Sequence, residues 1–139
     1  MAGGEVGASG SVGGLDPTRL FGGLRDLTDP GRLAGETARL LLDLADIAAG
    51  TSEVAIPERD KRFADVTWTE NPFYRRLAQT YLAWSASVDR LANARELRSD
   101  WRRHAQARYT GGLLTAMLAP TNFFWGNPTA VKRAFDTGG

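Results

Sequence analysis

The sequence predicts a mainly α-helical protein: a small irregular helical domain with a disordered, glycine-rich N-terminus, a long extended connector and no sheet of its own. Three observations support this prediction. Apolar residues recur at intervals of three and four in the long apolar segments, and no segment shows the period-two alternation of a strand. Proline, asparagine and glycine also stand where helices typically begin and end.

The N-terminal third contains one clear helix. Residues 1–14 are rich in glycine and serine, cannot bury enough apolar surface to offset the entropy of ordering them, and are predicted to be disordered. Residues 15–29 are apolar but contain Gly22 and Gly23, which favours one or two short helical turns broken at the glycines. Residues 32–49 have one apolar face, so we expect a helix that starts near Asp29-Pro30 and ends at Gly50.

The middle of the chain changes character twice. Residues 51–72 are polar, with isolated apolar residues and two prolines, and they predict an extended connector anchored by Phe63 and Trp68. Asn71 and Pro72 then form a typical helix start. The helix that follows carries a continuous apolar stripe: Leu77, Tyr81, Trp84, Val88 and Leu91.

Two further helices complete the prediction. One covers residues 94–118, begins with many arginines, becomes apolar past Gly111-Gly112 and is stopped by Pro120. The last is short, with Asn127 as its cap, Pro128 in its first turn and an end at Gly138. We divide the chain into the head 1–14, a variable helical segment 15–54 and a domain 55–139.

Composition excludes several classes of function. The chain has 139 residues, a net charge of +1 and no cysteine, so disulfides, thiolate metal sites and cysteine nucleophiles are excluded. It has no apolar run of about 18 residues and no signal-peptide pattern, so we expect no transmembrane segment and a cytoplasmic location.

Candidate catalytic residues lack the partners that their chemistry needs. His104 is the single histidine, lies among arginines and has no triad partners, so we interpret it as a surface or partly buried residue. The pairs Asp43/Asp46 and Glu58/Asp60 have lysine or arginine nearby, which is typical of solvated faces. We therefore predict no catalytic residues, no cofactor and no metal.

The arginine-rich start of the 94–118 helix, with Trp101 and Tyr109, is the best candidate for a charged partner. Its excess of only about three positive charges would release few counterions, so we expect no nucleic-acid partner. A membrane-surface helix remains an alternative, because Leu97, Trp101 and Ala105 could form an apolar face. An ordinary packing helix is the favoured interpretation.

The closing stretch LAPTNFFWGNPTAVKRAFDTGG (118–139) places three aromatic residues between two proline turns. Short helices cannot cover all of these side chains, and an exposed set would exceed the apolar patch that a soluble monomer usually carries. We therefore predict an interface here, with Asn122 and Asn127 shaping its turns. The candidate interface residues are Trp68, Asn71, Pro72, Tyr74, Pro120, Asn122, Phe123, Phe124, Trp125, Asn127 and Pro128.

The order RFADVTWTENPFYRRLAQTYLAW (62–84), a basic helix, then LAPTNFFWGNPTAVKRAFDTGG (118–139) resembles the N-terminal region of polyhydroxyalkanoate synthases. The resemblance covers about residues 55–139. It implies a parent enzyme that transfers the acyl group of (R)-3-hydroxyacyl-coenzyme A to a cysteine and extends a polyester. In that family the cysteine lies in a Gly-x-Cys-x-Gly turn of an α/β-hydrolase domain. This sequence contains neither that turn nor that domain. We expect the chain to be either an isolated domain or a truncated gene product.

The resemblance thus predicts a chain that is not itself an enzyme. Its implied roles are dimerisation as a homodimer, attachment to a polyester granule or a granule-associated protein, and docking onto the catalytic α/β-hydrolase domain in cis or in trans. The alternatives are a standalone helical interaction module and a granule or membrane-surface binder that uses the basic helix. The location implied is the cytoplasm, at polyhydroxyalkanoate granules.

Overall fold

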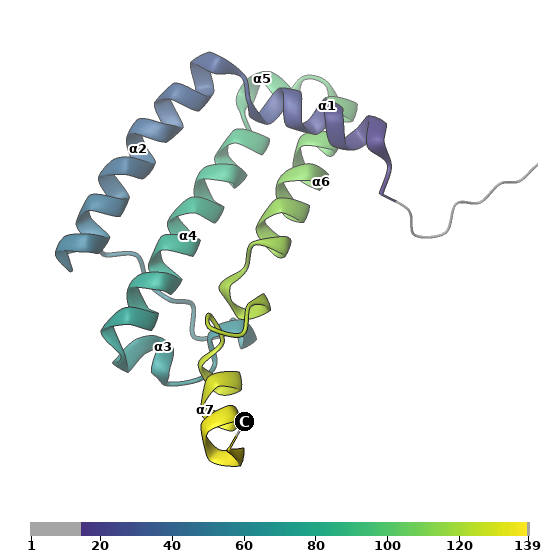
Figure 1. Ribbon diagram of the computed structural model, residues 1–139. Helices are drawn as coiled ribbons and strands as arrows, with labels where there is room; N and C mark the ends of the chain where they lie inside the picture. The colour runs from purple at the N-terminus through teal and green to yellow at the C-terminus, as the bar shows by residue number, and fades with distance from the viewer. Residues whose placement is uncertain (1–14, 139) are drawn as a thin grey trace, which may run out of the picture.

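The computed structural model describes residues 15–138, and every regular element in that range is a helix (Figure 1). This confirms the predicted mainly α fold with no sheet of its own. The prediction that residues 1–14 are disordered lies outside the described residues. The elements are α1 (Pro17–Leu27), α2 (Pro30–Ala49), the 3-10 helix η1 (Lys61–Phe63), α3 (Thr67–Glu70), α4 (Pro72–Ala92), α5 (Arg95–Arg98), α6 (Trp101–Met117), the 3-10 helix η2 (Pro120–Asn122) and α7 (Pro128–Thr137).

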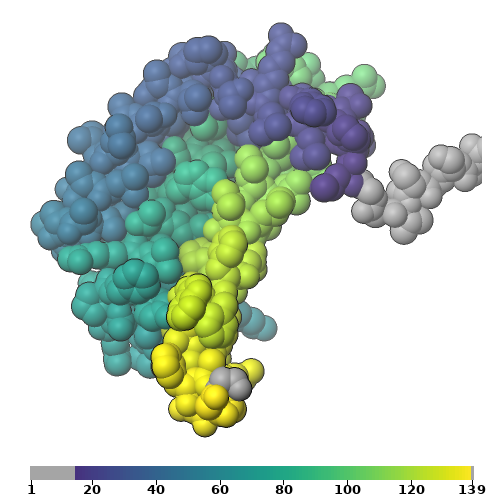
Figure 2. Space-filling view, viewed as in Figure 1, coloured from purple at the N-terminus to yellow at the C-terminus, as the bar shows by residue number. Residues whose placement is uncertain are grey.

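The helices α2, α4 and α6 lie side by side, with α4 in the middle (Figure 1). α1 crosses α6 at one end of this layer, while the connector and α3 lie at the other end, where α7 extends away from the body. Figure 2 shows α2 along one edge of the molecule and the C-terminal segment projecting at its lower end. The layer therefore leaves one face of each outer helix open.

Local sequence explains where most helices begin and end. The side chains of Asp29, Asn71 and Asn127 accept hydrogen bonds from backbone N–H groups of the first turn, and a proline follows each of them. Gly50 and Gly138 end α2 and α7 in the left-handed conformation, with φ of 80° and 76°. These findings confirm the predicted boundaries at Asp29-Pro30, Gly50, Asn71-Pro72, Asn127-Pro128 and Gly138.

The predicted break at Gly22 and Gly23 is wrong, because α1 runs through both glycines. α1 crosses α6 at Gly23, which is buried: a Cβ there would collide with Thr110 Oγ1 and lie 2.6 Å from the backbone oxygen of Gln106. Gly23 therefore permits a close helix–helix approach, and α6 supplies the packing that offsets its poor helix propensity.

The predicted single helix over residues 94–118 is also wrong at its start. The chain forms α5, leaves the helix at Ser99 and begins α6 at Trp101, with Asp100 accepting hydrogen bonds from the N–H groups of Arg102 and Arg103. An aspartate inside one long helix would compete with the helical backbone, whereas here it caps a new helix. The glycine pair 111–112 lies within α6, which continues to Met117.

The connector is less uniform than predicted, since η1 and α3 interrupt it. Its two aromatic anchors are buried, Phe63 being 5% exposed and Trp68 1%. Gln79 of α4 also donates a hydrogen bond to the backbone oxygen of Val54, at 3.0 Å. These contacts hold the connector, which contains little helix, against α4.

The core forms two clusters at opposite ends of the helical layer. One joins α1, α4, α5 and α6 through Leu27, Leu91, Ala92, Leu97 and Ala107. The other joins the connector, α3, α4 and the segment after α6 through Phe63, Trp68, Ala78, Tyr81 and Ala119.

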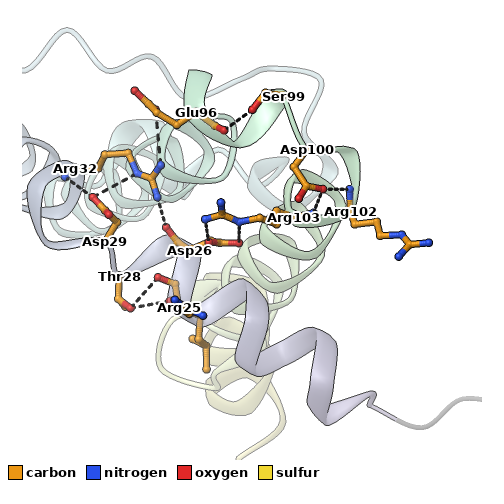
Figure 3. A network of polar contacts seen from close by, with 11 residues as sticks. Arg25, Asp26, Thr28, Asp29, Arg32, Glu96, Ser99, Asp100, Arg102 and Arg103 are labelled. Carbon is orange, nitrogen blue, oxygen red and sulfur yellow. Dashed lines mark hydrogen bonds and ion pairs between the residues drawn. The ribbon is translucent and has the colours of Figure 1, made fainter.

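A polar network joins α1 to the neighbouring helices (Figure 3). Asp26 of α1 is buried and accepts two hydrogen bonds from the guanidinium of Arg103 on α6. Arg32 of α2 donates to the backbone oxygen of Asp26 at 2.7 Å. The hydrogen bonds to Asp26 raise the pKa of Arg103 above its ordinary value. The network thus fixes α1 to both α2 and α6.

Candidate docking groove

An open apolar groove of about 440 Å³ lies between α4 and the segment that follows α6. One wall comes from α4 and the other from residues 118–126. Its lining residues are Phe73, Leu77, Thr80, Tyr81, Trp84, Leu118, Pro120, Phe123, Trp125 and Gly126.

The α4 wall arises from helical spacing. Leu77, Tyr81 and Trp84 follow one another at intervals of four and three, so their side chains share one face of α4. The hydroxyl of Tyr81 donates to the backbone oxygen of Thr115 at 2.8 Å and accepts from Arg62 at 3.0 Å. The base of the groove is therefore tied to α6 and to the connector.

The opposite wall is a tight turn that depends on Gly126. Gly126 is buried against Pro120: a Cβ there would collide with the Pro120 backbone oxygen and lie 3.0 Å from its carbonyl carbon. Asn122 Nδ2 donates to the backbone oxygen of Ala116 at 2.6 Å, and the Tyr74 hydroxyl donates to that of Trp125 at 3.4 Å. The turn is thus braced from α6 and from α4.

The rim of the groove exposes aromatic side chains. Trp125 is 76% exposed, Phe73 65% and Phe123 53%. Phe124 is 49% exposed, and its ring meets that of Trp125 edge-on at 5.1 Å between centroids. A braced apolar groove with exposed aromatic residues at its rim can bind an apolar side chain or segment.

The predicted interface residues fall into two groups. Phe123, Phe124 and Trp125 are exposed at or beside the groove. The others serve the fold of the chain itself: Trp68, Pro120 and Pro128 are buried, Asn71 and Asn127 cap helices, Pro72 lies in the first turn of α4, Asn122 braces the turn, and Tyr74 packs against Trp68. A role of any of them in an interface stays a prediction.

Sequence reasoning missed the α4 wall. The sequence identifies Leu77, Tyr81 and Trp84 only as members of an apolar stripe, and it does not single out Phe73 or Leu118 as interface candidates. Periodicity alone could not separate core from groove, because both use the same helical face. The available signal was Phe73, which extends that stripe into the first turn of α4.

Several ionisable residues form ion pairs within the fold. Asp60 accepts hydrogen bonds from Arg62, at 2.7 Å from Arg62 Nη2, and these bonds hold the pKa of Asp60 below its ordinary value. His104 Nε2 lies 3.0 Å from Asn93 Oδ1.

Residues 15–138 contain no cluster of three or more side chains suited to bind a metal ion. No helix among them has the length and apolar character needed to cross a membrane.

Asp65 ties α7 to the connector. Its carboxylate accepts hydrogen bonds from the Thr67 backbone N–H at 2.9 Å, the Thr129 hydroxyl at 3.1 Å and Lys132 Nζ at 3.0 Å. These bonds, those from Thr67 first, hold the pKa of Asp65 below its ordinary value. Their stabilisation is therefore complete above the unfolded-state pKa of about 3.9 and is lost as the pH falls through the lower folded-state pKa.

We expect Asp65→Asn to loosen α7 at pH 7. Thr129 and Lys132 of α7 donate hydrogen bonds to Asp65, and loss of these bonds should lower the amide protection factors of residues 128–137 about five-fold, which corresponds to about 1 kcal/mol. The wild-type chain should begin to lose the same protection as the pH falls below about 3.9 and should lose it fully only below the lower folded-state pKa of Asp65. The matched control is Asp136→Asn, also on α7 and exposed. Unchanged protection in Asp65→Asn would contradict this role.

Comparison of the sequence with known proteins identifies relatives of this chain. The family model described as poly-beta-hydroxybutyrate polymerase (PhaC) N-terminus matches residues 59–139. Poly(3-hydroxyalkanoate) polymerase 1 of Ectopseudomonas oleovorans is 40% identical over 107 residues, which are 76% of this chain and 18% of that protein. Poly(3-hydroxyalkanoate) polymerase 2 of the same organism is 38% identical over 107 residues, 77% of this chain and 17% of that protein.

A third relative is the poly(3-hydroxyalkanoate) polymerase subunit PhaC of Rhizobium meliloti (strain 1021), 30% identical over 123 residues, 81% of this chain and 20% of that protein. The chain thus spans about a fifth of the length of the curated relatives that it matches. No solved structure matches it.

Proposed function

We propose a function from one premise: this chain belongs to the poly-beta-hydroxybutyrate polymerase (PhaC) N-terminus family. Because it spans about a fifth of its polymerase relatives, we assign it a role beside the catalytic part. That role is a non-catalytic docking region, residues 55–139, with residues 15–54 as a variable helical segment in front of it. Its partner is the catalytic α/β-hydrolase domain of the polymerase.

The apolar groove between α4 and residues 118–126 carries this proposal. Its lining is almost entirely apolar, and the exposed rings of Phe73, Phe123 and Trp125 surround it. Packing one aromatic side chain buries about 150–250 Å², so three of them would supply a large share of a specific interface. Because the turn is braced by Gly126 and Asn122, the groove is formed before its partner arrives.

We assign acyl transfer to the catalytic domain because this chain lacks the cysteine nucleophile. Transfer of an acyl group from a 3-hydroxyacyl thioester to the enzyme needs an activated side chain, which the family resemblance assigns to a cysteine. This chain contains no cysteine. In our proposal the catalytic domain supplies the cysteine and its acid–base partners, while this region positions that domain without taking part in acyl transfer.

We expect the chain to bind the catalytic part of a relative. The probe is Poly(3-hydroxyalkanoate) polymerase 1 of Ectopseudomonas oleovorans without the N-terminal region that matches this chain. Titration calorimetry should show binding that Phe73→Ser combined with Trp125→Ser weakens at least about ten-fold. The matched control is Trp101→Ser, because Trp101 is 72% exposed but lies on α6, away from the groove.

Two outcomes would contradict the docking role. One is the absence of binding, and the other is equal weakening by the groove variant and by Trp101→Ser. Catalysis is checked separately by incubating the chain alone with 3-hydroxybutyryl-coenzyme A and following thiol release. Release above a buffer blank would contradict the non-catalytic assignment even if docking were observed.

Granule attachment, or a standalone interaction module, is the alternative, and one observation favours it. Trp101 is 72% exposed, and the guanidinium of Arg102 lies 5.3 Å from the centroid of its ring. An exposed tryptophan beside arginines suits an amphipathic surface. Trp101→Ser therefore has a second use: reduced binding to isolated polyester granules with intact docking would support this alternative.

A further inference from the structure

A pocket of about 350 Å³ lies where α1 crosses the first half of α6 (Figure 1). This volume is typical of a small-molecule site. The pocket shares no lining residue with the docking groove, so a function for it is independent of the docking role. Its lining residues are Arg19 of α1 and Trp101, Arg102, Ala105, Gln106 and Tyr109 of α6.

Helical spacing gives the pocket an elongated shape. Trp101, Ala105 and Tyr109 follow one another at intervals of four, so they form a row along one face of α6. The two aromatic residues stand about 12 Å apart along the helix axis, and the small, exposed side chain of Ala105 leaves space between them. The Thr110 hydroxyl donates to the backbone oxygen of Arg19 at 3.4 Å, which places Arg19 near the Tyr109 end of the row.

Gln106 supplies a polar group in the middle of the pocket. Its amide lies against α1, since a Cβ on Gly22 would stand 2.6 Å from Gln106 Oε1. Gly22 therefore leaves room for this amide between the two helices. An amide both donates and accepts hydrogen bonds, and a glutamine can contact two edge atoms of adenine at once. The middle of the pocket is thus suited to the edge of a nucleobase.

Two guanidinium groups make the pocket attractive to anions. That of Arg102 lies 5.3 Å from the centroid of the Trp101 ring, points away from the polar network (Figure 3) and forms no ion pair within residues 15–138. Arg19 Nε pairs with Asp16 at 3.3 Å, but both side chains are exposed, and such a pair contributes little. Because Asp100 already accepts hydrogen bonds from N–H groups that begin α6, anion binding rests on the arginine side chains.

We propose that this pocket binds an adenine nucleotide with at least two phosphates. The base stacks on the Trp101 ring in the space over Ala105, with the Gln106 amide at its edge. The phosphates extend along the pocket to Arg19, while Arg102 supports the Trp101 ring from its other face. Stacking on an aromatic ring and charge-assisted hydrogen bonds from arginine are the usual means of holding a nucleotide. Two sources share this chemistry: a free nucleoside diphosphate and the phosphorylated adenosine end of coenzyme A.

The first test is titration calorimetry of the chain with adenosine diphosphate at physiological ionic strength. We expect a dissociation constant of about ten to several hundred micromolar. Adenosine lacks the phosphates and pyrophosphate lacks the base, so each should bind at least about ten-fold more weakly. Coenzyme A in a parallel titration distinguishes the two sources, because the tighter ligand identifies the source. Pyrophosphate that binds as tightly as adenosine diphosphate would reduce the pocket to an anion site and contradict the proposal.

The second test removes the groups that hold the base and the phosphates. Trp101→Ala and Arg19→Gln should each weaken binding of adenosine diphosphate at least about five-fold, whereas Trp101→Phe keeps an aromatic ring and should retain most of it. The matched controls are Trp125→Ala and Arg108→Gln, because both residues are exposed and neither lines the pocket. Circular dichroism of each variant checks that it is folded.

The third test fills the space for the base. Ala105→Leu should weaken nucleotide binding at least about ten-fold, because the larger side chain occupies the place of the base beside Trp101. Ala105→Ser keeps the space and should bind as wild type does. A membrane-surface helix predicts the opposite sign, since a more apolar face strengthens binding to vesicles of phosphatidylcholine and phosphatidylglycerol.

The fourth test is a gain of affinity. Asp16→Asn should tighten nucleotide binding about two- to five-fold, because it releases Arg19 from its ion pair and removes a negative charge beside the phosphates. Asparagine is as good a helix cap as aspartate, so the start of α1 is preserved.

Several results would overturn the nucleotide site. Absence of binding of both adenosine diphosphate and coenzyme A at millimolar concentration contradicts it, as does equal weakening by Arg19→Gln and Arg108→Gln. Unchanged nucleotide binding in Ala105→Leu contradicts the position of the base. Vesicle binding that Ala105→Leu strengthens, without nucleotide binding, would assign this face to a lipid surface. Docking of the catalytic probe should persist in Ala105→Leu, which separates this proposal from the docking role.

Discussion

Trp68→Ala is expected to lower the free energy of unfolding by about 3–5 kcal/mol, the usual cost of truncating a buried aromatic side chain. Trp68 is 1% exposed, and its ring meets those of Phe63 at 4.9 Å and Tyr74 at 5.4 Å between centroids. Removing it leaves a cavity where the connector, α3 and α4 join. Urea unfolding followed by far-ultraviolet circular dichroism measures the loss.

The chain supplies a matched control for this prediction. Trp125 is 76% exposed, so Trp125→Ala should change the free energy of unfolding by no more than about 0.5 kcal/mol. If Trp68→Ala were no more destabilising than Trp125→Ala, the second core cluster would not hold the connector as described.

Gly23→Ala is expected to destabilise the fold by about 1–3 kcal/mol, although alanine is normally the better helix former. The added methyl group would collide with Thr110 Oγ1, and the backbone oxygen of Gln106 behind it cannot rotate away. α1 must then shift from α6, which strains the contact between Asp26 and Arg103. Thermal unfolding and the amide protection of residues 17–27 report the change.

Gly112→Ala is the matched control, because it makes the same substitution in a helix where a Cβ meets no atom within 4 Å. It should stabilise the fold by about 0.5–1 kcal/mol through lower backbone entropy in the unfolded state. Equal signs for the two glycine variants would show that helix propensity, not helix crossing, determines the effect at Gly23.

The sequence predicted well those features that depend on neighbouring residues. Asn71 followed by Pro72 and Asn127 followed by Pro128 mark helix starts, because a cap needs only the backbone of the next turn. The left-handed end of α2 at Gly50 is equally local. The absence of period-two alternation also indicated an all-helical fold correctly within residues 15–138.

Features that depend on distant residues were predicted poorly. Gly23 looks like a helix breaker until Thr110, far along the chain, is placed against it. Trp68 and Pro128 were predicted as candidate interface residues, which stays untested, and both side chains are buried within this chain. The groove escaped prediction for the same reason, because its two walls come from α4 and from residues 118–126. No local pattern encodes which segments will meet.

The crossing of α1 over α6 has a consequence for synthesis on the ribosome. Asp26 and its partner Arg103 are 77 positions apart, and Thr110 contacts the backbone of Arg19 across 91. At ordinary elongation rates of about 5–20 residues per second, α1 therefore waits roughly 4–15 seconds before its docking surface has been translated. During that delay α2 can already pack against α4, whereas α1 still lacks α6, its main packing partner. An early-emerging helix is therefore expected to dock in one of the last steps of folding.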